Sequence, residues 1–183
     1  MKQITVLILA VFLYTVTGFA QSGQLHVPPE YDSIGQKVYE GFDHMFDRVE
    51  EYVKPNGNIT REGMDSVRRA AMSEFAGQHP EVEAYLSGNS TASPDAQPST
   101  PELQALLGKI SEAVKNFKPK TGFEKLERQL GEINRKAAGT LSEAETNKVY
   151  AVSVTSFYST KYWLENGLRW QSLGEYVKAN RKK

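Results

Sequence analysis

Two runs of apolar residues at three- and four-residue spacing, joined by a short polar turn, constrain the fold more than any other feature. The first follows Thr100-Pro101-Glu102, where a capping hydroxyl, an N1 proline and a first-turn acid mark a helix start. Thr121 and Glu124 form a capping box before the second. Because this spacing gives each helix one apolar face, we expect an antiparallel hairpin. Its apolar residues are Leu103, Leu107, Ile110, Val114 and Phe117, then Phe123, Leu126, Leu130, Ile133 and Ala137.

The first half of the chain shows the same spacing. After a short polar lead that ends with Pro28-Pro29, the pattern predicts a helix from about Asp32 to Lys54, with apolar residues Tyr31, Ile34, Val38, Phe42, Met45, Val49 and Tyr52. Thr60 can cap a second helix, which extends through Phe75. One or two further turns are expected between Glu81 and Leu86. Residues 88–100, which contain no aliphatic side chain larger than alanine, are typical of a flexible loop.

A long uncharged segment follows the hairpin. Ser142 and Glu145 fit another capping box, and residues 149–160 carry no charge. The valines and aromatics suit a strand, but no turn signal occurs before Asn166-Gly167, and this length is too great for one strand. We therefore predict a helix from Ser142 to Glu165 that is apolar all round and central to a bundle. A last amphipathic helix is expected from Leu168 to Lys178.

The fold class predicted from these segments is all-α. We expect one domain, residues 21–183, built as a bundle of about five helices around the Ser142–Glu165 helix.

Residues 1–20 have the layout of a secretory signal. Lys2 precedes an apolar stretch, and Gly18 and Ala20 place small residues before a cleavage site after Ala20. A membrane anchor is the alternative, but the apolar run is shorter than the ~20 residues that span a bilayer. The chain has no cysteine, which excludes disulfides and a lipid-anchor cysteine. We therefore expect a secreted or periplasmic protein without stable membrane insertion after cleavage.

The charges are distributed unevenly. Residues 21–99 hold 6 basic and 13 acidic side chains, whereas residues 100–183 hold 15 basic and 9 acidic ones. This asymmetry favours docking of the two halves on each other, and the alternative is a basic surface for an anionic partner. The basic end, Lys178 to Lys183, is typical of a solvated helix terminus. We expect no nucleic-acid partner.

Motifs for catalysis or cofactor binding are missing from the sequence. It has no Gly-x-Ser-x-Gly elbow, no Ser-x-x-Lys and no Gly-rich phosphate loop, so we assign no catalytic residue and no cofactor. Glu40, His44, Asp47 and Glu51 share one helical stripe and could ligate a divalent metal. The stripe lies opposite the apolar face and no Glu-x-x-His occurs, so we assign no metal site. The 22 acidic residues leave a carboxylate pair for glycan cleavage open.

Aromatic residues near the C-terminus are the candidate binding residues. Tyr158 and Tyr162 lie one helical turn apart, and with Trp163 and Trp170 they could line a groove or an exposed patch. Aromatics with one polar atom suit contacts with sugars, peptides or protein interfaces. The alternative is that the two tyrosines belong to the core of the bundle.

Two short segments carry a resemblance. Tyr31-Asp32-x-Ile34-Gly35 with Gly41-Phe42-Asp43, and later Tyr158-Ser159-x-x-Tyr162-Trp163, resemble a loose group of uncharacterised small secreted helical proteins of Gram-negative bacteria. A His-Asn pair is often present in that group where this chain has Val38-Tyr39. The resemblance implies a secreted helical fold and no particular activity.

The function expected from the sequence is that of a secreted or periplasmic helical binding or structural protein. Its partner would be a protein or glycan of the cell envelope. The alternative is an envelope hydrolase that uses a carboxylate pair on glycan or peptidoglycan.

Overall fold

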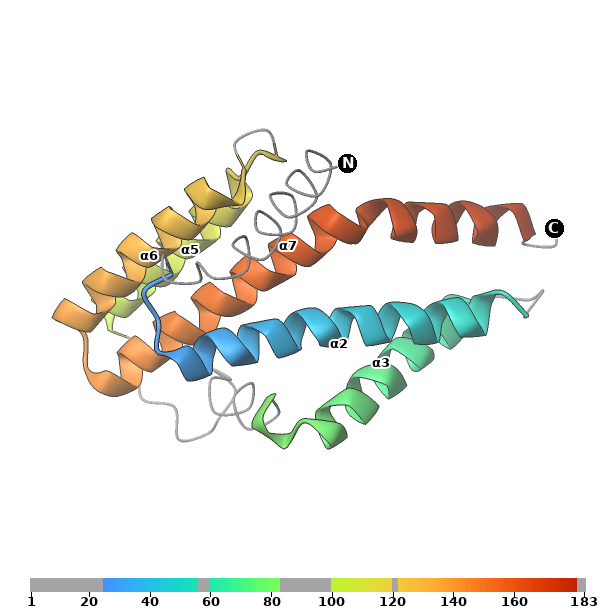
Figure 1. Cartoon of the computed structure of the whole chain (residues 1–183), viewed down its shortest axis with the longest axis horizontal. Helices are drawn as coiled ribbons and strands as arrows, with labels where there is room; N and C mark the ends of the chain where they lie inside the picture. Colours follow the sequence, from blue (N-terminus) through green and yellow to red (C-terminus); the bar gives the residue numbers. More distant parts are fainter. Residues whose placement is uncertain (1–24, 56–59, 83–99, 120–121, 181–183) are drawn as a thin grey trace, which may run out of the picture.

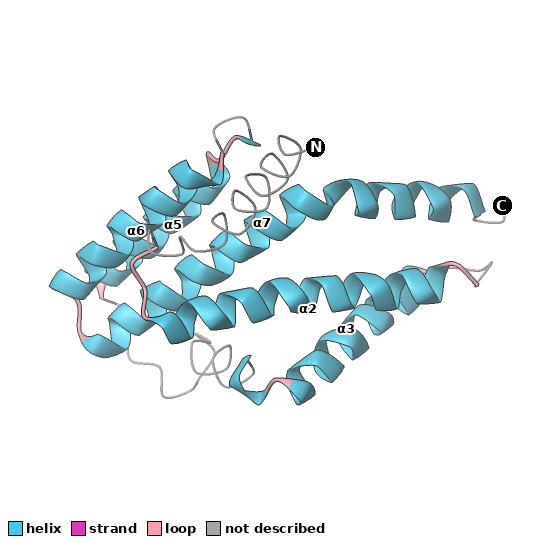
Figure 2. Cartoon of the chain, in the orientation of Figure 1, coloured by secondary structure: helices cyan, strands magenta, loops and turns pink. Residues whose placement is uncertain are grey.

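The computed structural model describes residues 25–55, 60–82, 100–119 and 122–180, which contain helices and no strand (Figure 2). The all-α prediction is therefore confirmed. The predicted signal segment, Thr121 and residues 88–99 of the predicted loop lie outside the described residues. The helices are α2 (Pro29–Val53), α3 (Arg61–Gln78), α5 (Pro101–Lys115), α6 (Phe123–Thr140) and α7 (Glu143–Asn180).

Helices α2 and α7 run side by side along the molecule (Figure 1). The predicted hairpin is confirmed: α5 and α6 pack against each other and against the first half of α7. Helix α3 folds back along α2. The second half of α7 extends past the hairpin beside α2, so α7 belongs to both ends of the bundle.

The side-chain caps predicted at Thr60 and Thr100 are present, whereas α6 has Gly122 at its N-cap and no side-chain hydrogen bond there, so the predicted capping box of Thr121 and Glu124 does not start this helix. Thr60 accepts a hydrogen bond from the Gly63 amide at 3.0 Å, and Thr100 accepts one from the Leu103 amide at 3.2 Å. Helix α2 begins at Pro29, earlier than predicted, because proline is tolerated at a first helical position.

Before α7, the Ser142 hydroxyl accepts from the Glu145 amide at 3.4 Å, and the Ser142 amide donates to Glu145 Oε2 at 3.3 Å, which is the reciprocal capping box. The Glu145 carboxylate also accepts a 2.6 Å hydrogen bond from the Thr100 hydroxyl. One acid therefore joins the starts of α5 and α7, and these hydrogen bonds, Thr100 first, lower the pKa of Glu145.

The predicted break between two helices at Asn166-Gly167 is wrong, because α7 is continuous from Glu143 to Asn180. The Asn166 side chain donates to the Tyr162 carbonyl at 3.2 Å and to the Tyr39 hydroxyl at 3.1 Å, so it hydrogen-bonds both within α7 and to α2. Leu173 and Val177, further along, are buried against α2. Burial of these apolar side chains favours continuation of the helix past Gly167.

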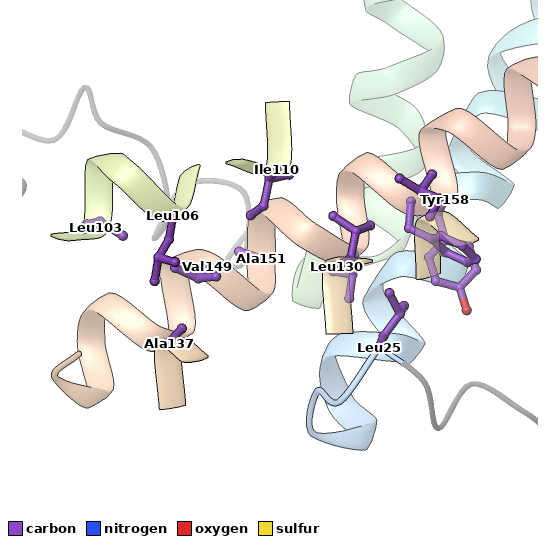
Figure 3. Packing of buried hydrophobic residues seen from close by; sticks show 12 residues of the cluster. Leu25, Leu103, Leu106, Ile110, Leu130, Ala137, Val149, Ala151 and Tyr158 are labelled. Atoms are coloured by element: carbon purple, nitrogen blue, oxygen red, sulfur yellow. The ribbon is translucent and has the colours of Figure 1, made fainter. Parts of the chain in front are cut away.

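Two apolar clusters form the core. The larger lies between α5, α6 and the first half of α7, and it includes Leu106, Leu130 and Val149 (Figure 3). The smaller one joins Phe46, Val49 and Val53 of α2 to the last part of α7. Helices α2 and α7 therefore hold the two clusters together.

The segment before α2 belongs to the larger cluster rather than to a purely polar lead. Leu25 is fully buried, and its carbonyl accepts a 2.7 Å hydrogen bond from the side chain of Asn134 on α6. The side-chain oxygen of Asn134, Oδ1, accepts another, also 2.7 Å, from the Ser153 hydroxyl on α7. This buried polar chain fixes the entry of α2 against α6 and α7.

Within the described ranges, none of the helices combines the length and apolarity that a bilayer-crossing segment needs.

Candidate binding surface

The contact between α2 and α7 buries Tyr158. Its side chain is 8% exposed, its ring lies against Gly35, and its hydroxyl donates to Asp32 Oδ1 at 2.8 Å. Gln36 donates to the other oxygen of the Asp32 carboxylate at 3.2 Å. Burial is the main cause that raises the pKa of Tyr158, and the hydrogen bond to Asp32 is the second. The phenol is therefore held neutral inside the bundle.

Tyr162, one turn later, is fully buried. Its ring stacks on Phe42 with centroids 5.2 Å apart and meets Tyr39 edge-on at 5.2 Å. Its hydroxyl accepts a 3.1 Å hydrogen bond from the Trp170 indole. Burial raises the pKa of Tyr162. A binding surface would need these two tyrosines to be accessible, and the structure instead places both in the core.

The two tryptophans lie at the margin of this aromatic core. Trp163 is 46% exposed, and its ring centroid lies 5.6 Å from Tyr162, 6.2 Å from Phe42 and 5.4 Å from Trp170. Trp170 is half-buried and meets Phe46 edge-on at 4.9 Å. Trp163 is therefore supported on one side by packed rings and open on the other.

Exposed large apolar side chains are confined to α7 in the part of the chain that the structure describes. They are Val152, Trp163, Leu164, Leu168 and Tyr176. Three of them, Trp163, Leu164 and Leu168 (78% exposed), lie within two turns and form what we call the α7 apolar patch. Of the predicted binding residues, only Trp163 belongs to it.

Sequence reasoning missed Leu164 and Leu168 as surface residues, because it ended the central helix at Glu165 and began a separate helix at Leu168. The signal that could have found them is their i, i+4 spacing. On one continuous helix, this spacing places Leu164 and Leu168 about 40° apart, so they share one face.

No protein-family model, curated protein or solved structure matches this chain. The structure does relate the two segments that carry the resemblance noted above. Asp32 and Gly35 contact Tyr158, and Phe42 stacks on Tyr162, so both segments belong to the same α2–α7 contact. Kinship with those secreted proteins stays a prediction.

Beside the aromatic core, Arg169 of α7 contacts two acidic side chains and one aromatic ring of α2. Arg169 of α7 donates to Asp43 at 2.7 Å and to Asp47 at 3.2 Å, and its guanidinium lies 4.2 Å from the Phe46 ring centroid. Among the described residues, the ion pairs between the acidic and basic halves all involve Arg169. Ion pairing between the two halves is therefore confined to Arg169, whereas aromatic and aliphatic contacts extend along both α2 and α7.

The stripe considered for metal binding is divided among other contacts. Glu40 pairs with Lys37 at 2.6 Å, and Glu51 pairs with Arg48 at 3.2 Å. His44 Nε2 lies 3.6 Å from a Glu74 oxygen on α3. The described residues contain no group of three or more acids and histidines arranged to hold a metal ion.

Carboxylates come close to each other where α6 faces α2. Glu127 of α6 is partly buried near Asp32. Burial is the main cause that raises the pKa of Glu127, and the charge of Asp32 is the second, whereas the charge of Lys161 lowers this pKa.

An open groove of about 390 Å³ runs between α5 and α6. Its lining residues, which include acids and bases, are Leu106, Lys109, Glu112, Ala113, Asn116, Gln129, Glu132, Ile133 and Lys136.

Proposed function

We propose that this chain is a secreted or periplasmic binding or structural protein without enzymatic activity, acting through the α7 apolar patch. The observation that carries the proposal is the exposure of Leu168, 78%, on the same helix as Trp163, which is 46% exposed. Covering a leucine side chain contributes roughly 1.5–3 kcal/mol. A partner that covers the patch would therefore gain affinity from side chains that contribute little to folding.

The support beneath Trp163 adds to this proposal. Tyr162, Phe42 and Trp170 surround one side of the indole, so its position is fixed before a partner arrives. A rigid aromatic side chain loses little conformational entropy on binding, and tryptophan is enriched among interface hot spots. Trp163 therefore suits an anchor role in a protein contact.

Site-specific photo-crosslinking in a secreting host tests the proposal. A photoreactive residue in place of Leu168 should form adducts with another macromolecule, because the patch is covered in the working protein. The same residue in place of Val152, which is also exposed on α7, serves as the matched control. Adducts at neither Leu168 nor Trp163, in a protein that is folded and exported, would contradict the proposal.

An envelope hydrolase acting on glycan or peptidoglycan is the second candidate. The observation in its favour is the raised pKa of Glu127 beside Asp32, since a general acid needs a carboxyl group that stays protonated. Asp32, however, is occupied by Tyr158 and Gln36 within the packed α2–α7 contact. Loss of muropeptide release in Glu127→Gln, with folding retained, would favour the hydrolase over the binding protein.

A further inference from the structure

We infer that the open groove between α5 and α6 is a second binding site, and that its ligand is a short extended peptide with one acidic and one basic side chain. The groove lies on different helices from the α7 apolar patch, so this inference goes beyond the proposed function and does not depend on it. Four features of the groove support a ligand of this kind: its apolar floor, its unpaired polar side chains, the order of its charges, and its length.

The groove combines an apolar floor with a polar rim. Leu106 is buried at the floor, where Ala113 and Ile133 are half-buried. Each helix adds three exposed polar side chains to the rim: Lys109, Glu112 and Asn116 from α5, and Gln129, Glu132 and Lys136 from α6. Within the described ranges, these six side chains make no hydrogen bond and no ion pair. They are therefore available to a ligand that the apolar floor supports.

The charges follow the same order along both helices. Phe117, just after α5, stacks on Phe123 at the start of α6 with ring centroids 5.4 Å apart, and the two helices run antiparallel from this turn (Figure 1). Toward the turn, α5 presents a lysine, a glutamate and an amide at positions 109, 112 and 116, and α6 presents the same sequence of groups at positions 136, 132 and 129. The groove therefore has a cationic end away from the turn, an acidic middle, and an amide end nearer the turn.

This order matches a ligand that carries both charges. The lining holds two lysines and two glutamates, so its net charge is zero and a chain of like charges fits only part of it. On each helix the lysine and the glutamate are three or four residues apart, which is about 4.5–6 Å along the axis. Alternate side chains of an extended peptide share one face at about 6.4–6.8 Å. An acid and a base at alternate positions therefore reach the cationic end and the acidic middle together, since the lysine and glutamate side chains are flexible.

Length and side-chain amides select a peptide among ligands of both charges. Leu106 and Asn116 are ten positions apart on α5, so the groove is about 15 Å long and takes four or five extended residues. Asn116 and Gln129 each offer a donor and an acceptor, which is the complement of a peptide unit. The apolar floor can cover the aliphatic stems of the charged ligand side chains. Because the rim is exposed, we expect weak binding that falls as salt is raised.

A methyl NMR titration of protein recovered from a secreting host tests this inference. The probe is the capped peptide acetyl-Ala-Glu-Ala-Lys-Ala-amide, and three control peptides carry two glutamines, two glutamates or two lysines at the charged positions. The Ala113 and Ile133 methyl signals should shift and saturate with the probe. Its dissociation constant should be roughly three- to tenfold lower than that of each control peptide. Equal affinity for the four peptides, or no shift of these methyl signals, would overturn the inference.

Exchange of the rim charges gives a sharper test. Lys109→Glu combined with Lys136→Glu makes the charged rim entirely acidic, so this double variant should bind the two-lysine peptide best. Arg128→Glu combined with Arg135→Glu is the matched control, because both arginines are exposed on α6 outside the groove lining and the change in net charge is the same. The control should keep the wild-type ranking of the four peptides. A control that changes this ranking as the groove variant does would overturn the assignment of the peptide to the groove.

The results are independent of the test of the proposed function. Saturable shifts of the Ile133 methyl signal by the probe, without photo-adducts at the α7 apolar patch, would support the groove and contradict the proposed function. Photo-adducts at Leu168 without such shifts would leave the proposed function standing and overturn the inference about the groove.

Discussion

Gly35 determines how closely α2 and α7 approach each other. A methyl group at this position would lie 2.6 Å from Cε2 of Tyr158, far inside van der Waals contact. The ring can therefore lie against the α2 backbone at Gly35, and its hydroxyl reaches the Asp32 carboxylate. The missing side chain, the buried ring and the buried acid are thus parts of one contact.

Gly35→Ala should destabilise the protein by about 1–3 kcal/mol, because overpacking of the Tyr158 ring outweighs the higher helix propensity of alanine. Gly108→Ala on α5 is the matched control, since a methyl group there meets no atom within 4 Å. That variant should gain about 0.5–1 kcal/mol. Urea unfolding of both variants measures the change in the free energy of unfolding. A stabilised Gly35→Ala would show that the contact between α2 and Tyr158 is looser than described.

At the scale of elements, the helices that sequence predicts best are those whose signals are local. The spacing of apolar residues in α5 and α6, and the caps at Thr60, Thr100 and Ser142, depend on residues a few positions apart. The continuity of α7 is favoured instead by contacts with α2 that are distant in the sequence: the burial of Leu173 and Val177, and the hydrogen bond from Asn166 to Tyr39, 127 residues away. No local pattern contains those contacts, so Asn166-Gly167 has the appearance of a turn in the sequence.

Gly167→Ala tests the continuity of α7. Within a helix, alanine should stabilise the protein by about 0.5–1 kcal/mol, because a methyl group at Gly167 meets no atom within 4 Å. Gly122→Ala offers a contrast: this glycine is equally free of contacts, but its φ of 70° disfavours a side chain. Thermal unfolding should rank Gly167→Ala above the wild type and Gly122→Ala below it. A Gly167→Ala variant that unfolds at a lower temperature than the wild type would indicate a turn at Gly167 and contradict a continuous α7.

At the scale of the whole molecule, three helices contribute to one partly buried group of interacting polar side chains. Asp32 on α2 holds Tyr158 on α7, and Glu127 on α6 faces the charge of Asp32. The candidate site depends on the same global arrangement. The sequence supplies the aromatic residues, but which of them α2 covers depends on a contact between segments 126 residues apart. For this reason Tyr158 and Tyr162 could not be assigned to core or surface beforehand.

The raised pKa of Glu127 predicts how stability responds to pH. The unfolded side chain releases its proton near its ordinary value of 4.5, and the folded one releases it at higher pH. Stability should therefore fall as the pH rises through and above this value. Glu127→Gln removes the charge, so its midpoint of urea unfolding should exceed that of the wild type at pH 7 and by less at pH 4. Glu132→Gln, exposed on the same helix, is the control. An equal difference at both values would contradict the electrostatic cause.

The shared role of α2 and α7 in both clusters has a consequence for biosynthesis. The ribosome completes α2 first and α7 last, and 126 residues separate Asp32 from Tyr158. At ~5–20 residues per second, roughly 6 to 25 s pass between them. During that interval the face of α2 that carries Phe42 and Phe46 lacks its final cover. A chain that terminates before α7 keeps this aromatic face exposed, so we expect nonsense products of this protein to aggregate or to be degraded.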